Sequence, residues 1–206
     1  VLQEDVYRSH LNSLKDVCSE YSRVTSGLTF QEFALFKEKL IEVEEAFEPG
    51  CSKLNWNALG FNTFVHSARC AIDSFEKSVL EVRRISKSIK ELTETISELN
   101  FFSPSYTDEA EGDIGVLPEL DDVMGTLERT RDEIMERAVG KYKEVSNLLS
   151  DIEFCVIGTR SKKAPEMQAF YEFSERSVYR ALVRAICSSL RSFRRDFISR
   201  RDGANA

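Results

Sequence analysis

Two histidines and five cysteines are the side chains best suited to metal binding or nucleophilic catalysis, and their spacing favours neither. A metal centre in a helical bundle needs Glu and His side chains that converge from facing helices, often as Glu-x-x-His pairs. Neither His10 nor His66 follows a Glu by three residues. The cysteines never form a C-x-x-C pair, the spacing typical of zinc and redox sites; they are Cys18, Cys51, Cys70, Cys155 and Cys187. We therefore expect no metal site.

Other catalytic motifs are also missing from the sequence. It contains no G-x-x-x-x-G-K-[ST] phosphate loop, no G-x-S-x-G nucleophile elbow and no Gly-rich dinucleotide turn. Four of the five cysteines lie on or next to apolar stripes, where a thiol packs as a small hydrophobic group. We expect buried, unpaired thiols in a reducing compartment. The sequence thus predicts a segment that is not an enzyme and holds no cofactor.

The charge balance excludes further classes of partner. The formal net charge of −7 disfavours a general nucleic-acid binder, because phosphate contacts need a positive surface. No run approaches 18 apolar residues, so we expect no membrane span. The first five residues lack the basic and apolar regions of a signal peptide. Because the sequence begins with Val1, we expect a piece of a longer chain.

One row of arginines is the best candidate for binding chemistry. The row repeats at steps of four and seven, which places it along one edge of a helix; its members are Arg176, Arg180, Arg184, Arg191 and Arg195. An acidic stretch between Asp108 and Glu136 carries the opposite charge. The two sets either neutralise each other across a helix pair or lie in solvent. Alternatively, the arginine edge docks an acidic protein, since arginine is favoured at interfaces.

Helices must position these residues. Hydrophobic residues make up 42% and charged residues 31% of the chain, while nine Gly and four Pro are few for a turn-rich β fold. From Phe61 to Asn100, apolar residues recur at steps of three and four without Gly or Pro. This pattern predicts a helix of roughly forty residues, about 60 Å long. We predict an all-α fold: an elongated bundle of about five helices, three of them long.

The first half of the chain, residues 1–100, is expected to hold three helices. The first covers residues 1–24 and ends at Ser26-Gly27. Thr29 and Glu32 fit a capping box that starts the second helix, which we expect to reach Phe47. Its buried face is predicted to hold Phe33, Phe36, Leu40, Val43 and Phe47.

A structural corner is predicted between the second and third helices. Proline and glycine should end the second helix, with the glycine as a left-handed cap. The ten residues that follow are too irregular for a helix, and an indole there can plug the corner. The predicted corner residues are Pro49, Gly50, Leu54, Trp56 and Leu59.

The second half is expected to form an acidic loop over residues 101–117 and a long helical hairpin over residues 118–206. The first arm should end near Ile157, with Gly125 and Gly140 as candidate bends. Pro165 should open the last helix, which we expect to run to about Arg200. Its predicted inner face holds Met167, Phe170, Tyr171, Ser174, Val178, Leu182, Ala185, Ile186, Leu190, Phe193 and Phe197. We treat residues 1–206 as one helical-bundle segment.

Residues around the predicted corner resemble a known family. Residues 47–50 read F-E-P-G, residues 53–61 read K-L-N-W-N-A-L-G-F, and Phe64-Val65 follow. This series is similar to the "PG, x-x-L-x-W-x-S-L-x-I, x-x-F-I" signature in the N-terminal tail of dynein heavy chains. Lys141-Tyr142, the region of Glu153 and residues 170–176 (F-Y-E-F-S-E-R) match further positions of that tail. The resemblance covers most of residues 30–200, with Ala in place of a common Ser and Ser in place of a common Trp.

The resemblance implies a stiff, non-catalytic strut in the heavy chain tail of a microtubule motor, whose ATPase ring lies elsewhere. Such tails associate with a second heavy chain, dock intermediate, light and light intermediate chains, and attach to cargo or axoneme. Residues 55–60 are closer to the axonemal form of the motif, which implies a cytoskeletal location in a cilium or flagellum. Two alternatives stay open: a generic spectrin-like or coiled-coil scaffold, and a four-helix metal enzyme.

Overall fold

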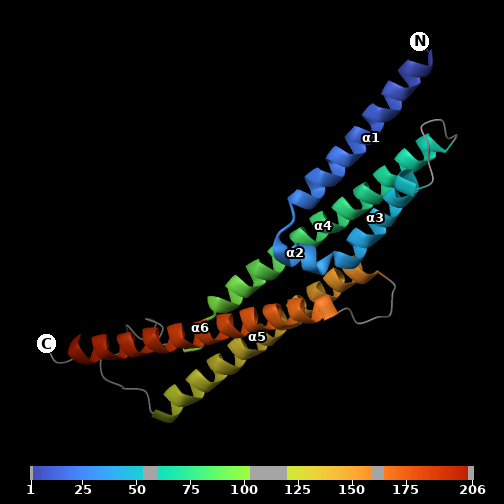
Figure 1. The fold of residues 1–206 in the computed structure, drawn as a ribbon. Coiled ribbons are helices and arrows are strands. Elements are labelled where there is room, and N and C mark those ends of the chain that lie inside the picture. Colours follow the sequence, from blue (N-terminus) through green and yellow to red (C-terminus); the bar gives the residue numbers. More distant parts are fainter. Residues whose placement is uncertain (1, 53–59, 103–119, 159–164, 204–206) are drawn as a thin grey trace. The chain divides into compact units, whose positions relative to one another are not determined.

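The computed structural model describes residues 2–52, 60–102, 120–158 and 165–203. These residues form six helices and no strand, which confirms the all-α class (Figure 1). The helices are α1 (Leu2–Ser26), α2 (Phe30–Leu35), α3 (Lys37–Ser52), α4 (Phe61–Ser97), α5 (Leu120–Ile157) and α6 (Pro165–Gly203). The last three have 37, 38 and 39 residues, so the prediction of three long helices is also confirmed.

The chain divides into two compact units. The first unit comprises Val1–Ile85 and Asp151–Phe170, and the second comprises Ser86–Ser150 and Tyr171–Ala206. In the first unit, α4 packs against α1 and α3 (Figure 1). The rings of Phe36 and Phe75 meet edge to face with centroids 5.5 Å apart, and those of Tyr21 and Phe47 lie 5.4 Å apart.

The apolar stripe predicted for α4 is the buried face of that helix. The buried members recur at steps of three and four, as an amphipathic helix requires; in the first unit they are Phe61, Phe64, Val65, Ala68, Ile72, Phe75, Val79, Val82 and Ile85. The same row continues in the second unit with Ile89 and Ile96. The predicted helix over residues 61–100 is therefore confirmed to within three residues.

The predicted second helix is divided in two. The capping box at its start is confirmed, since the Glu32 N–H donates to Thr29 Oγ1 at 3.2 Å and the Thr29 N–H donates to the Glu32 carboxylate at 2.8 Å. Phe36, with φ −96° and ψ 12°, then ends α2, and α3 begins at the next residue. This turn changes which side chains face inward: Leu35 is buried and Phe33 is 53% exposed, so the prediction for Phe33 was wrong.

The prediction that Pro49 and Gly50 end a helix was also wrong. Helix α3 continues to Ser52 with Pro49 inside it, and Gly50 does not adopt a positive φ. Proline has no backbone N–H, so Pro49 removes one hydrogen bond from the helix. In the last turn this loss is tolerated, because few helical hydrogen bonds follow it. Gly50 serves close packing instead, because a Cβ there would lie 2.8 Å from two ring carbons of Phe64.

Several predictions fall outside the described residues: the corner residues Leu54, Trp56 and Leu59, the acidic loop, and the basic loop before α6. The prediction of buried thiols was wrong where it can be checked. Three of the described cysteines are exposed and one is part-buried; the exposed ones are Cys18, Cys70 and Cys187. Cys70, for example, lies two residues from both Ala68 and Ile72 of the buried row, and at 3.6 residues per turn this places it on the opposite side of α4.

In the second unit, α5 and α6 pack with the residues that directly follow α4. A core of Leu99, Phe101, Ala138 and Ala185 joins the three segments. The predicted end of α5 and start of α6 are confirmed. Gly158, with φ +65°, caps α5 in the left-handed conformation, and its N–H donates to the Phe154 carbonyl at 2.9 Å.

Candidate protein-docking surface

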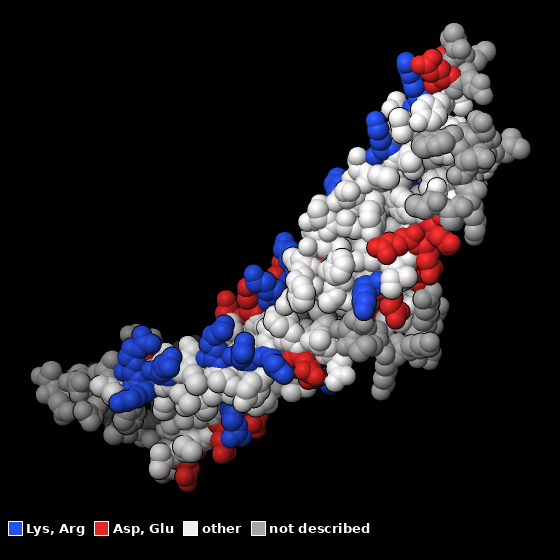
Figure 2. Space-filling view, in the orientation of Figure 1, with Lys and Arg blue, Asp and Glu red and all other residues white. Residues whose placement is uncertain are grey.

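All five arginines of the predicted row lie on α6 in the second unit, and all are exposed. Figure 2 shows blue side chains along the strip of surface that α6 forms. Steps of four and seven residues place the side chains on one side of a helix. The predicted residues are therefore together on one solvent-facing side; whether a partner binds them stays a prediction.

Three of these arginines have no carboxylate partner among the described residues. Arg176 pairs with Glu172 one turn away at 3.3 Å. In the described part of the chain, no ion pair reaches Arg180, Arg184 or Arg191. The acidic residues of α5 within that part thus leave these three guanidinium groups free to accept an outside partner.

The positive charge is concentrated in a short stretch of α6. Residues 179–195 contain five arginines and no Asp or Glu, although the whole chain carries a net charge of −7. A strip of one sign steers partners of the opposite sign and selects among them. Guanidinium groups also bind carboxylates through two parallel hydrogen bonds, which adds geometric selectivity.

Large apolar side chains lie beside the arginines on the exposed side of α6. Tyr179, Val183 and Leu190 are 68%, 40% and 48% exposed. The prediction that Leu190 faces inward was wrong, because the neighbouring Ser189 occupies the buried position instead. These exposed residues belong to a row visible in the sequence: Tyr179, Val183, Ile186, Leu190 and Phe193 follow each other at alternating steps of four and three. Ile186 and Phe193 are part-buried, and Ile186 packs against the core as predicted.

A buried hydrogen bond of Ser189 joins α6 to the segment that follows α4. The Phe101 N–H donates to Ser189 Oγ at 2.9 Å, and the same hydroxyl donates to the Ala185 carbonyl at 2.7 Å. These groups are buried, so the hydroxyl satisfies a backbone donor that water cannot reach. This bond sets which side of α6 faces the core and which side is left outside.

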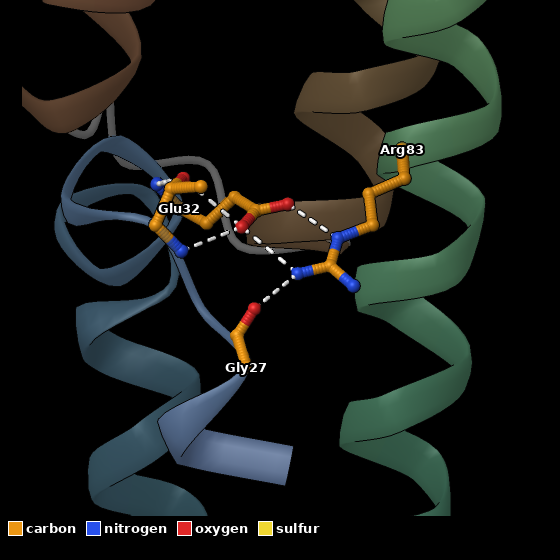
Figure 3. A network of polar contacts seen from close by, with 4 residues as sticks. Gly27, Glu32 and Arg83 are labelled. Atoms are coloured by element: carbon orange, nitrogen blue, oxygen red, sulfur yellow. Dashed lines mark hydrogen bonds and ion pairs between the residues drawn. The ribbon is translucent and has the colours of Figure 1, made fainter.

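A second polar centre lies in the first unit (Figure 3). Arg83 of α4 donates to both carboxylate oxygens of Glu32, at 2.6 and 3.0 Å, and to the Gly27 carbonyl at 2.7 Å. The hydrogen bond from Arg83 is the main cause that lowers the pKa of Glu32 to about 2, and bonds from Thr29 add to it. The network joins the end of α1 and the start of α2 to α4, which is a structural role.

The described ranges show neither metal-site nor membrane-span features. Within them, no group of three or more His, Cys, Asp and Glu side chains converges as a metal site would require. None of the described helices has an apolar run long enough to cross a bilayer. His66 Nε2 and Cys70 Sγ lie 3.7 Å apart on adjacent turns of α4. Two potential ligands alone do not make the four-coordinate site of a structural zinc.

Comparison with known proteins agrees with the resemblance seen in the sequence. The family model "Dynein heavy chain, N-terminal region 1" matches residues 1–64. The chain is 33% identical over 181 residues, 88% of its length, to the Dynein-1-alpha heavy chain of the flagellar inner arm I1 complex of Chlamydomonas reinhardtii. It is 28% identical over 193 residues, 93% of its length, to the human Dynein axonemal heavy chain 10. It spans 4% of the length of each relative. The chain belongs to the dynein heavy chain family and represents the N-terminal region of these proteins.

Proposed function

We propose that this segment is a non-catalytic strut and docking element in the tail of an axonemal dynein heavy chain. The observation that carries the proposal is the similarity to flagellar and axonemal heavy chains over 88% and 93% of the chain, on a fold of three long helices. In this proposal, the parent chain is a microtubule-motor ATPase in a cilium or flagellum, and its catalytic parts lie outside this segment.

The helices suit a load-bearing role. Each of α4, α5 and α6 is 37 to 39 residues long, which corresponds to about 55 Å or more of helix axis. The helices bury continuous apolar rows against their neighbours, and close-packed interiors are only slightly compressible. Force that enters one end of such a helix is carried along its axis rather than lost in bending.

The arginine row of α6 is the proposed docking edge. Its expected partners are other dynein subunits: an intermediate, light or light intermediate chain, or a second heavy chain. Three of its exposed arginines, Arg180, Arg184 and Arg191, have no carboxylate partner among the described residues, and exposed apolar side chains lie on the same helix. Arginine and exposed apolar groups together are two features of protein interfaces. An acidic surface on the partner would complete the ion pairs that the described residues leave open.

The test is assembly of the parent motor with a charge-reversed row. Arg180→Glu with Arg184→Glu, introduced into the full heavy chain, should reduce co-purification of at least one associated subunit tenfold or more. Arg69→Glu with Lys77→Glu reverses two exposed charges of the first unit and is the matched control. If both double variants recover the full set of subunits, the arginine row is not a docking edge.

A further inference from the structure

We infer that the outer side of α6 is a helix-docking seam for an acidic amphipathic helix of a protein partner. The inference rests on the docking role proposed for α6 and adds the chemistry and secondary structure of what binds there. We call the residues Tyr179, Val183, Ile186, Leu190 and Phe193 the outer seam. Tyr179, Val183 and Leu190 are exposed, and Ile186 and Phe193 are part-buried. Ile186 also packs against the core of the second unit, so it lies at the edge of the seam nearest to that core.

The large apolar side chains of α6 are divided between the core-facing side of the helix and the outer seam. The buried residues of its inner side in the second unit are small or medium-sized; they are Ser174, Val178, Ala181, Ala185 and Ser189. The larger Leu182 and Ile186 are part-buried and pack against the same core. The outer seam holds larger side chains, two of them aromatic. Tyr179, Val183 and Leu190 nevertheless stay exposed together on one side of α6. Exposed apolar groups that lie side by side next to charged residues indicate that this side has a partner of its own.

The spacing of the outer seam identifies a helix as the partner. Alternating steps of four and three residues are the repeat by which one helix packs along another, each side chain entering a hole between four residues of its neighbour. In this repeat Val183 and Leu190 take one seam position, and Tyr179, Ile186 and Phe193 take the other. A membrane-surface helix has a wider apolar face, whereas a strict two-position seam is typical of helix pairing.

The arginines next to the seam predict that the partner is negatively charged. Arg180 and Arg194 follow the seam residues Tyr179 and Phe193 directly, at the flanking position where coiled coils form interhelical ion pairs. No acidic residue lies between positions 179 and 195. A partner helix with Glu or Asp at its facing flank would therefore pair with arginines along this edge.

A second copy of this seam is a poorer occupant. In an antiparallel pair, the same flank of each helix faces the other, so Arg180 of one copy would face Arg194 of the next. In a parallel pair, Arg180 would face Glu175 and Arg194 would face the uncharged Ser189. The antiparallel pair thus places like charges together, which costs binding energy, and the parallel pair supplies one carboxylate for two arginines. A partner helix with acidic residues at both facing positions matches this edge better.

The test uses the whole chain and a synthetic 21-residue peptide. The peptide has Leu at both seam positions of each heptad and Glu at both flanks, and a scrambled peptide of equal composition is its control. Binding is measured by fluorescence anisotropy. Val183→Ser with Leu190→Ser changes only exposed seam residues, and Leu80→Ser with Ile41→Ser changes exposed apolar residues of the first unit as a control.

We expect the Val183→Ser/Leu190→Ser variant to lose at least tenfold in affinity, and the Arg180→Glu/Arg184→Glu variant likewise. The scrambled peptide should bind at least tenfold more weakly, and the control variant should bind like the wild-type chain. Circular dichroism should show equal helix content in all variants.

Four results would overturn the inference. If charge reversal weakens binding but the seam variant does not, the edge binds acidic segments of any conformation, and only the docking role survives. If neither variant has an effect, the docking role on α6 fails as well. If the chain alone sediments as a dimer and the seam variant as a monomer, a second copy occupies the seam. If the chain binds phosphatidylserine vesicles and the seam variant does not, a membrane occupies it.

Discussion

Replacement of Gly50 by alanine should destabilise the first unit, although alanine is the better helix former. A Cβ at Gly50 would lie 2.8 Å from Cε1 and Cε2 of Phe64, closer than packed atoms approach. Phe64 is buried, so its ring cannot move aside freely. Overpacking of this kind costs about 1–3 kcal/mol, while removal of a helical glycine returns about 0.5–1 kcal/mol. We therefore expect a net loss of about 1 kcal/mol, from a range of about 0–2.5 kcal/mol.

Gly140 provides the matched control. It lies within α5, and a Cβ there would meet nothing within 4 Å. The same substitution at Gly140 should therefore stabilise the chain by about 0.5–1 kcal/mol. Urea unfolding followed by circular dichroism gives both free energies.

The opposite signs of the two substitutions are the result to look for. A stabilising Gly50→Ala would show that α3 and α4 do not approach as closely as the structure has them. As a further check, Phe64→Leu removes the ring that the new Cβ meets, so Gly50→Ala should cost less in that background.

The remaining predictions concern the buried hydroxyl of Ser189 and the solvent-accessible ion pair of Glu32 and Arg83. Ser189→Ala should lower the free energy of unfolding by about 1–3 kcal/mol, because it leaves the buried Phe101 N–H without an acceptor; Ser150→Ala, at an exposed serine of α5, should change it by less than about 0.5 kcal/mol. In a urea titration, an equal effect of the two would contradict this role of Ser189. The folded-state pKa of Glu32 is lowered from 4.5 to about 2, so its ion pair with Arg83 stabilises the fold above pH 4.5 and is lost as the pH falls toward 2. Arg83→Met should flatten the dependence of stability on pH in this window, and an unchanged acid-unfolding curve would rule out the network as a source of stability.

Much of the fold could be predicted from the sequence, because amphipathic helices have a characteristic spacing of apolar residues. The row from Phe64 to Ile96 has no glycine, no proline and a single apolar stripe, so its helical state and buried face were both predictable. The capping box at Thr29 and Glu32 was equally clear, since two side chains and two backbone donors satisfy each other locally.

The errors occur where packing between helices overrides local preference. The sequence of Pro49 and Gly50 is typical of a helix end, yet α3 continues past both residues. Gly50 is needed because its backbone packs closely against the ring of Phe64. On α6, two apolar stripes lie side by side, and periodicity alone cannot tell which one faces the core. The choice of Ser189 over Leu190 depends on the Phe101 N–H, which lies 88 residues away in the sequence.

The exposed arginine row was predictable, because charged side chains at steps of four and seven stay on one side of a helix. The spacing of the apolar seam beside it is visible in the sequence, but its exposure was not predictable, since the sequence assigned Ile186, Leu190 and Phe193 to the core. That assignment is confirmed for Ile186 and wrong for Leu190. The combination of charge and apolar surface became visible only when the structure showed Tyr179, Val183 and Leu190 to be exposed.

Hydrogen–deuterium exchange of the heavy chain, free and in the assembled motor, tests the docking role of α6 most directly. A helix that packs against a partner opens less often, so its amide protons exchange more slowly. The account predicts that residues 179–195 exchange at least tenfold more slowly in the assembled motor than in the free chain. Equal exchange of these residues in the two states, with slower exchange elsewhere in the segment, would contradict it.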